Sequence, residues 1–234
     1  MEKPLHKNLA FCLFTFTFLP AMLFQAGCKY GGLAGIFGTE GHHEKKIPAE
    51  YDLAENTEKK ILVLVEQPGW LDAQVNLRYY LTKIVRQDLM VKVKIPPENL
   101  IAYSTLSEFR ASEPDFSMLS PFDIGEALDA DMVLLIAVED YQLREMAEMG
   151  YYTGILNTRA VLFDTESAKK LWPRAEQSKS VKVGYEVEVG GLEVAVSRLV
   201  AASAYCTTRY FYDCPKAKFR IAEDRAGIGW EGWK

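Results

Sequence analysis

Lys60-Ile-Leu-Val-Leu-Val65 is a short, uninterrupted apolar run, and Ala130-Asp-Met-Val-Leu-Leu-Ile-Ala-Val138 is a second one. Runs of this length without polar alternation are typical of strands that are buried on both faces of a sheet. Between them, residues 71–89 carry apolar side chains at helical spacing, which predicts an amphipathic helix. Residues 90–95 alternate and predict a further strand, which Pro96 and Pro97 end. A chain that alternates strands and helices in this way predicts crossover units.

The pattern changes in the second half of the chain. Ser120 followed by Pro121 predicts the start of a helix over 121–128, directly before the second apolar run. Further segments, each with its own pattern, predict a strand over 151–163, a turn over 164–169, a return strand over 170–172, a half-buried strand over 181–189 and a final helix over 192–210. The expected fold class is therefore α/β, an α+β sandwich with helices packed on a mixed sheet. An antiparallel hairpin, a further strand and a C-terminal helix follow the crossover units.

The first residues have the features of an export signal. Lys3 and Lys7 precede an uncharged apolar run over 9–27 that ends in small residues. Gln25-Ala26-Gly27-Cys28 resembles the lipobox of bacterial lipoproteins, which implies cleavage of residues 1–27 and lipid on Cys28. An uncleaved membrane anchor is the alternative, because about 20 apolar residues suffice to span a bilayer. Both alternatives place the rest of the chain outside the cytoplasm.

The resemblance also implies a location. In the sorting rule of enterobacterial lipoproteins, an aspartate after the lipidated cysteine retains the protein in the inner membrane, and this chain has Lys29 there. We therefore expect a periplasm-facing protein on the outer membrane of a Gram-negative-type bacterium. The net charge of −5 does not favour nucleic acid, whose phosphates attract basic proteins, so we expect no nucleic-acid partner.

Composition divides the mature chain into three parts. Residues 28–57 begin with several glycines and continue into a polar stretch, which predicts a flexible, lipid-anchored tether. A single domain is expected over 58–215. The tail over 216–234 is rich in glycine and carries Trp230 and Trp233, which suits a loose end or a docking peptide.

Two cysteines lie in the expected domain, Cys206 and Cys214. An isolated pair in an oxidising compartment can form a disulfide. Eight residues of continuous helix rise about 12 Å, whereas bridged Cα atoms lie roughly 4.4–6.8 Å apart. A bridge therefore requires the helix to end near Arg209, and two separate thiols are the alternative.

The sequence shows no motif for catalysis and no set of residues that would bind a metal or another cofactor. The three histidines, His6, His42 and His43, all precede the expected domain, which excludes a histidine-based triad there. His42-His43-Glu44 lacks further ligands, so we expect a solvated linker and no metal site. Acidic side chains that could take part in acid–base chemistry are more simply explained as turn, cap or solvated residues: Asp115, Asp123, Asp129, Asp131, Glu139 and Asp140.

Residues 143–154 connect two predicted strands and combine methionine and tyrosine with charged side chains. Such side chains suit an adaptable contact surface, so Met146, Met149, Tyr151 and Tyr152 are candidate partner-binding residues. A loop packed onto the core is the alternative explanation. The alternation over 181–189 also fits a membrane-inserted hairpin, but we favour half burial in an ordinary sheet, which explains the same pattern.

Two phrases carry a family resemblance: Ile124-Gly-Glu-Ala-Leu-Asp-Ala-Asp-Met-Val-Leu-Leu135 and Ala160-Val-Leu-Phe-Asp-Thr-Glu-Ser-Ala-Lys-Lys-Leu-Trp172. Both resemble parts of an α/β module that is shared by curli-secretion lipoproteins, penicillin-binding-protein activator lipoproteins and the amino-terminal domain of the Tol-Pal protein TolB. The first phrase resembles the helix of that module that leads through an Ala-Asp turn into the central strand. The second phrase resembles the module's two long antiparallel strands and the turn between them. The resemblance covers about residues 59–210 and implies binding to other envelope proteins.

Three functions remain open at this point. The first is a non-enzymatic, lipid-anchored envelope protein whose domain binds other envelope proteins in an assembly or accessory role. The second is a self-associating subunit of an outer-membrane secretion pore. The third is a carboxylate-dependent envelope hydrolase, which we expect least. Ring formation would distinguish the second function from the first.

Overall fold

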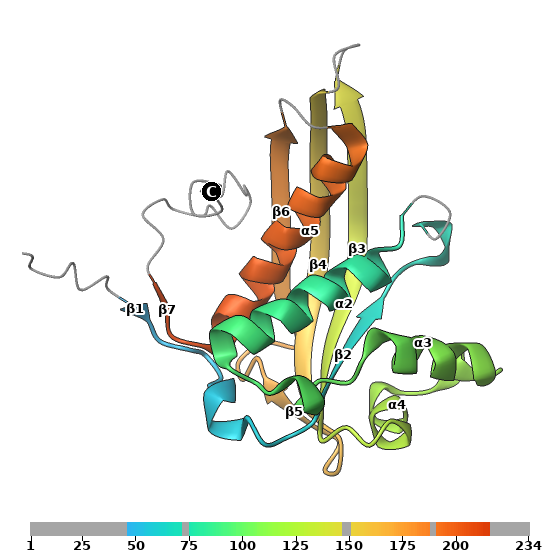
Figure 1. The fold of residues 1–234 in the computed structure, drawn as a ribbon, viewed down its shortest axis with the longest axis vertical. Coiled ribbons are helices and arrows are strands. Elements are labelled where there is room, and N and C mark those ends of the chain that lie inside the picture. The colour runs from blue at the N-terminus through green and yellow to red at the C-terminus, as the bar shows by residue number, and fades with distance from the viewer. Residues whose placement is uncertain (1–45, 72–74, 147–150, 188–190, 216–234) are drawn as a thin grey trace, which may run out of the picture. The chain divides into compact units, whose positions relative to one another are not determined.

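The structure, a computed structural model, describes residues 46–71, 75–146, 151–187 and 191–215 (Figure 1). Its strands are β1 (Lys46–Ile47), β2 (Ile61–Glu66), β3 (Met132–Met146), β4 (Tyr151–Asp164), β5 (Lys169–Trp172), β6 (Lys179–Val187) and β7 (Cys214–Pro215). The α-helices are α2 (Leu77–Asp88), α3 (Tyr103–Ser112), α4 (Pro121–Ala127) and α5 (Gly191–Thr208). A π-helix, η3 (Leu89–Val93), extends α2, and the short 3-10 helices are η1 (Leu53–Asn56), η2 (Gly69–Leu71), η4 (Pro97–Asn99), η5 (Phe116–Met118) and η6 (Arg209–Phe211).

The central sheet is mixed, which confirms the expected α/β class. Its strand order is β2-β3-β4, and both β5 and β6 pair with β4. β2 runs parallel to β3 and ends with Glu66 opposite Ala137. β3 and β4 are antiparallel and continue to Met146 opposite Tyr151. A parallel pair requires a crossover connection, and here the crossover contains α2, α3 and α4.

Alternate residues of β2 enter two different cores. The odd-numbered apolar residues belong to the larger core, which includes side chains of α2 and α5. Leu62 and Leu64 belong to a second core with Leu106 of α3 and Ile124 of α4. Successive strand residues point to opposite faces, so helices cover β2 on both sides, which explains its uninterrupted apolar run. Figure 1 shows α2 and α5 lying across one face of the sheet.

The predicted strand over 90–95 is wrong. Leu89 and Val93 are both buried and lie four residues apart, so they continue the buried stripe of α2 by another turn. In a strand, Val91 would share a face with Val93, but its side chain is 57% exposed. The helix ends at Lys94, whose φ of 72° is left-handed. Helical packing against the core therefore prevails over the local alternation.

The predicted boundary between tether and domain at residue 57 is also wrong. β1 pairs with β7, although the two strands lie at opposite ends of the described chain. Leu53 in η1 is fully buried in the larger core. The side chain of Asp52 accepts a 2.9 Å hydrogen bond from the Ala54 N–H and caps η1. Residues 46–57 therefore belong to the folded domain. The remaining tether and the tail over 216–234 lie outside the described residues.

Several local predictions are confirmed. Ser120 Oγ accepts a 3.2 Å hydrogen bond from the Asp123 N–H, and Asp123 Oδ2 accepts one of 2.9 Å from the Ser120 N–H, which forms a capping box on α4. The β4–β5 hairpin, β6 and the C-terminal helix α5 also form where the sequence predicted them. Val181 and Val183 of β6 are buried while Lys182 is exposed, so this strand is half-buried in the sheet.

Candidate interaction site on the long hairpin

β3 and β4 form a hairpin that extends well beyond β2, and β6 pairs with β4 as far as Tyr152. β2 ends opposite Ala137, and the register of β3 against β4 shifts between Val138 and Asp140. Beyond that irregularity β3 pairs only with β4 among the described strands. We call this part, residues 138–146 and 151–157, the distal hairpin. It projects at the top of Figure 1.

The distal hairpin is held in place by packing on one face. Tyr141 is 7% exposed, and burial raises its pKa to about 12. A Cβ at Gly154 would lie 3.0 Å from Cδ1 of Leu143 and 3.3 Å from Cδ2 of Leu199 in α5. The absent side chain therefore lets α5 approach the sheet closely.

The opposite face of the distal hairpin is polar. The Gln142 amide Nε2 donates a 3.2 Å hydrogen bond to Oδ2 of Asp140. Glu139 forms an ion pair with Arg159 of β4. Because these pairs are solvent-exposed, they contribute little to stability, and they keep this face hydrated.

Exposed apolar side chains gather at the end of the distal hairpin. Met146 and Tyr151 are directly opposite each other in the β3–β4 register, and their side chains are 52% and 40% exposed. Leu192, in the first turn of α5, is 55% exposed. Methionine and tyrosine adapt well to a partner surface, because one is flexible and the other combines an apolar ring with a hydroxyl.

The four predicted partner-binding residues therefore have different positions. Met146 and Tyr151 are brought together at the surface. Tyr152 is half-buried and packs against the larger core, while Met149 lies outside the described residues. β4 confirms the predicted strand over 151–163, whereas the predicted loop over 143–154 begins too early, because residues 143–146 belong to β3. The sequence signal for this extension of β3 was weak, since Arg144 and Glu145 interrupt the apolar pattern.

Sequence reasoning missed a second group of exposed side chains, on and beside α2. The side chains of Tyr79 and Tyr80 in α2 are 39% and 40% exposed. Trp70 in η2 is 58% exposed. The helical period could have shown this, because Leu77, Leu81 and Val85 already complete a buried stripe without the tyrosines.

The candidate acidic residues have structural contacts. Asp131 Oδ2 accepts a 2.7 Å hydrogen bond from the backbone N–H of Lys60, at the start of β2. Asp129 pairs with the Lys60 ammonium, which raises the pKa of that lysine. Asp123 caps α4, Glu139 and Asp140 have the contacts given above, and Asp115 is exposed before η5.

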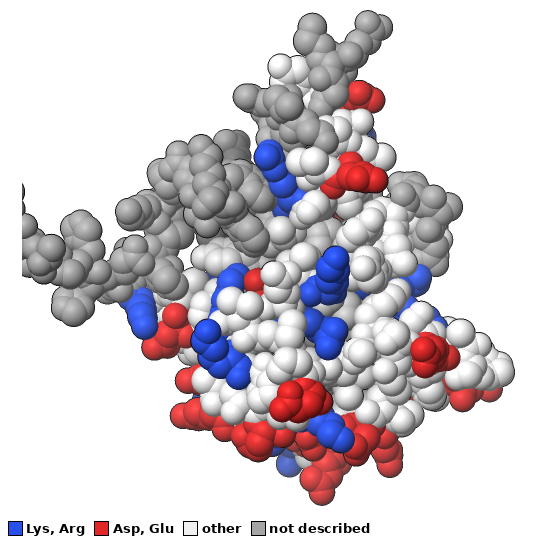
Figure 2. All heavy atoms as spheres, viewed as in Figure 1, with Lys and Arg blue, Asp and Glu red and all other residues white. Residues whose placement is uncertain are grey.

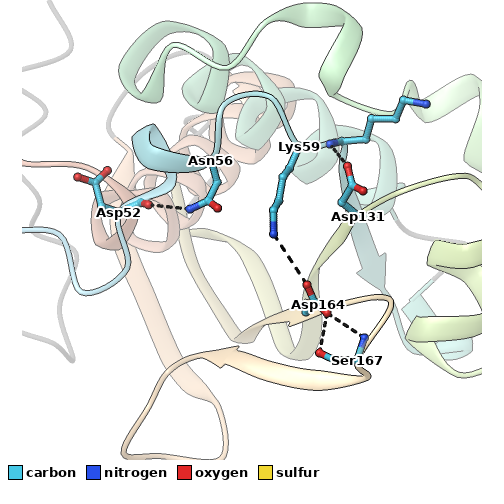
Figure 3. A network of polar contacts seen from close by, with 7 residues as sticks. Asp52, Asn56, Lys59, Asp131, Asp164 and Ser167 are labelled. Atoms are coloured by element: carbon cyan, nitrogen blue, oxygen red, sulfur yellow. Dashed lines mark hydrogen bonds and ion pairs between the residues drawn. The ribbon is translucent and has the colours of Figure 1, made fainter.

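A further carboxylate, Asp164 at the end of β4, contacts both the turn that follows β4 and the segment that precedes β2 (Figure 3). Its Oδ1 accepts hydrogen bonds from the Ser167 N–H at 2.9 Å and from Ser167 Oγ at 2.6 Å. Its Oδ2 lies 4.0 Å from Nζ of Lys59. The hydrogen bonds from Ser167 hold the pKa of Asp164 below its usual value, which marks a turn-stabilising carboxylate.

The structure shows Cys206 and Cys214 as two separate, buried thiols, which is one of the two alternatives that the sequence left open. Cys206 lies inside α5, while Cys214 lies in β7. Cys214 Sγ is 3.4 Å from the hydroxyl of Tyr205. Burial raises the pKa of the Cys206 thiol, so that thiol is protonated and unreactive at neutral pH.

The described residues form neither a metal site nor a membrane-spanning helix. Within residues 46–71, 75–146, 151–187 and 191–215, no three histidine, cysteine or acidic side chains gather as metal ligands. The helices of the same ranges are too short or too polar to cross a membrane. Cys28 and His42-His43-Glu44 lie outside these ranges.

No protein-family model matches the sequence, and no curated protein matches it. Some solved structures resemble parts of it. The lipoprotein GNA1162 of Neisseria meningitidis is 19% identical, with a TM-score of 0.36, over 61% of this chain and 95% of that chain. The PelC dodecamer of Paraburkholderia phytofirmans is 12% identical, with a TM-score of 0.33, over 69% of this chain and 94% of that chain. The hypothetical protein CT253 of Chlamydia trachomatis is 14% identical, with a TM-score of 0.30, over 54% of this chain and 71% of that chain.

Proposed function

We propose that this chain is a non-enzymatic lipoprotein of the bacterial cell envelope, held to the membrane by lipid on Cys28. Its α/β domain binds another envelope protein through the end of the distal hairpin. The observation that carries the binding role is the pair of exposed apolar side chains, Met146 opposite Tyr151, on a hairpin that projects beyond β2. The lipid anchor is supported by the lipobox-like sequence that ends in Cys28.

The hairpin is suited to binding because its exposed pair lies on two paired strands that pack against α5. Two strands position the exposed pair, and α5 packs against the hairpin's inner face through the close approach at Gly154. A preorganised surface loses little conformational entropy when it binds, so more of the contact energy becomes affinity. Central methionine and aromatic anchors surrounded by polar side chains are the usual composition of an interface.

Site-specific photocrosslinking tests the binding surface. A photoreactive phenylalanine analogue replaces Tyr151 in one strain and Met118, an 83% exposed residue of η5, in a control strain. We expect Tyr151 to give one defined crosslinked product with an envelope protein and Met118 to give none. Met146→Ser in the Tyr151 strain should abolish the product. Equal products from both positions, or a product that survives Met146→Ser, would contradict the proposed surface.

Lipidation is tested separately. Cys28→Ala should abolish labelling with a radioactive or clickable fatty acid and leave the precursor unprocessed. Cys206→Ala is the matched control, because that cysteine is buried in α5 and is not available for acylation. Normal processing and labelling of Cys28→Ala would show that the anchor assignment is wrong.

A second candidate function is an oligomeric subunit of an outer-membrane secretion pore. It is favoured by two strand edges that have no partner among the described strands: the outer edge of β6 and the outer edge of β3 beyond Ala137. Unpaired edges can join copies of a chain, and a head-to-tail contact that closes produces a ring. Light scattering of the detergent-extracted protein distinguishes the two functions. A discrete ring of many copies favours the pore, and a monomer or dimer favours the accessory role.

A further inference from the structure

The second exposed group, on α2, has a composition unlike that of the whole chain. Residues 77–94 contain five basic side chains, Arg78, Lys83, Arg86, Lys92 and Lys94, whereas the chain as a whole has a net charge of −5. The one acidic residue in this segment, Asp88, is buried and forms a 2.9 Å ion pair with Lys92. This segment therefore has an excess of positive charge in an acidic protein.

The charges are also segregated on the surface. Figure 2 shows basic side chains over α2 and acidic ones concentrated along the lower edge of the same view. A face with one sign of charge attracts a surface of the opposite sign over about a Debye length, roughly 8 Å at physiological ionic strength. The charge complement of the α2 side is therefore an anionic surface.

Exposed aromatic and apolar side chains lie on the same side of the helix as Lys83. Tyr79 and Lys83, four residues apart, lie opposite the buried stripe of Leu77, Leu81 and Val85. The exposed side chains of Tyr80 and Val91 flank this pair on one side. We call Tyr79, Tyr80, Lys83 and Val91 the α2 outer face. Tyr79 also packs edge-on against Tyr80 and Tyr103, with ring centroids 5.4 Å apart in each pair.

We infer that the α2 outer face lies on the headgroup region of a membrane that contains anionic lipids. Tyrosine and tryptophan are enriched at membrane–water interfaces because their rings are apolar and their edges are polar. Lysine near an anionic leaflet adds electrostatic attraction. A surface helix with aromatic residues and lysine on one face has the composition of an interfacial contact, which lies on the bilayer without crossing it. Trp70, exposed just before α2, has the same interfacial character.

This inference rests on the proposed function, because lipid on Cys28 would bring the domain to the bilayer. About 18 residues separate Cys28 from Lys46, and an extended segment of that length reaches at most about 60 Å. The domain could therefore touch the same membrane that holds its anchor. Even a weak contact between the α2 outer face and lipid then keeps the domain on the membrane, because the tether raises the effective concentration of this face near the bilayer.

Vesicle binding of the unlipidated protein tests the inference. The probe is the chain from residue 28 with Cys28→Ser, incubated with vesicles of phosphatidylethanolamine and phosphatidylglycerol, and with vesicles of phosphatidylcholine alone. We expect binding to the first kind only, weakened by salt. Lys83→Gln should lower the partition coefficient about fivefold, since one basic residue near an anionic surface contributes roughly that factor. Lys182→Gln, on an exposed position of β6, is the matched control and should leave it unchanged.

The apolar contribution is tested with Tyr80→Ser, which should also weaken binding, against Met118→Ser as the control. Equal binding by Lys83→Gln and Lys182→Gln would overturn the inference. Retention of the probe on an immobilised acidic polypeptide without vesicle binding would assign the face to an acidic protein and would equally overturn it. Failure of vesicle binding while the wild-type chain is still acylated refutes this contact alone. Loss of acylation at Cys28 refutes the anchor instead.

Discussion

The indole Nε1 of Trp172, in β5, donates a 2.9 Å hydrogen bond to Oε2 of Glu50, in the segment before η1. The Trp172 ring is buried, and it packs against Phe211 and Tyr210 with centroids 4.9 and 5.4 Å away. Glu50 Oε1 also lies 2.9 Å from Nζ of Lys179 in β6. Residues far apart in the chain therefore fasten the N-terminal segment to the sheet.

Leu53→Ala should destabilise the domain, because Leu53 is fully buried in the larger core. Truncation of a buried leucine costs about 2–5 kcal/mol, from lost burial and from the cavity that remains. Urea unfolding followed by circular dichroism measures the change. Ile47→Ala, at a 53% exposed position of β1, should cost less than about 1 kcal/mol. Similar midpoints for both variants would mean that residues 46–57 do not contribute to the fold.

Asp88→Ala should also be strongly destabilising. Asp88 Oδ2 accepts a 3.0 Å hydrogen bond from Thr208 Oγ1, so it connects the end of α2 to the end of α5, and it also pairs with Lys92. Removing the carboxylate takes one hydrogen-bond acceptor from the buried Thr208 hydroxyl and the ion-pair partner from the partly buried Lys92 ammonium, which costs about 2–4 kcal/mol. Glu108→Ala, an exposed substitution in α3, is the control for a lost helical carboxylate. A thermal midpoint for Asp88→Ala within error of that control would contradict the predicted link.

Gly154→Val should separate α5 from the distal hairpin. The added atoms would overlap with Leu143 and Leu199, and overpacking of this kind costs about 1–3 kcal/mol. Gly69→Val serves as the control, because no atom lies within 4 Å of a Cβ built there. Chemical denaturation of both variants measures the difference. A Gly154→Val protein that is as stable as the control would show that α5 does not approach the hairpin closely.

Stability at acid pH should depend on Asp164. Hydrogen bonds from Ser167 are the main cause that lowers the pKa of Asp164 in the folded chain below its ordinary value of 3.8. A lowered folded-state pKa stabilises the fold above the unfolded-state pKa, and this contribution is lost as the pH falls through the folded-state pKa. Asp164→Asn keeps an acceptor for Ser167 but does not titrate.

The wild type should therefore be more stable than Asp164→Asn at neutral pH, and the difference should shrink below about pH 4. Denaturation midpoints between neutral pH and pH 3 measure this difference. Glu166→Gln, at an exposed position of the same turn, should give no pH-dependent difference from the wild type. A constant gap between wild type and Asp164→Asn across the range would refute the role assigned to this carboxylate.

Local sequence patterns predicted the elements whose cause is local. The uninterrupted apolar runs of β2 and β3 predicted strands buried on both faces, and the larger and second cores explain why both faces of β2 must be apolar. Ser120 predicted the start of α4, because a cap satisfies backbone N–H groups within the same turn. The features that end in Cys28 likewise predict export and lipidation from residues that are adjacent in the chain.

Tertiary structure decided whatever depended on a distant partner. Residues 90–95 fit a strand and a helix equally well, and packing of Val93 on the core selected the helix. Met146 became part of β3 because β3 and β4 pair along their full lengths, although the charged residues Arg144 and Glu145 directly precede it. Burial of Leu53 and the contact between Glu50 and Trp172 joined the N-terminal segment to the domain. Contacts between residues that are far apart in the chain produce no local, periodic pattern in the sequence, so only the folded structure reveals them.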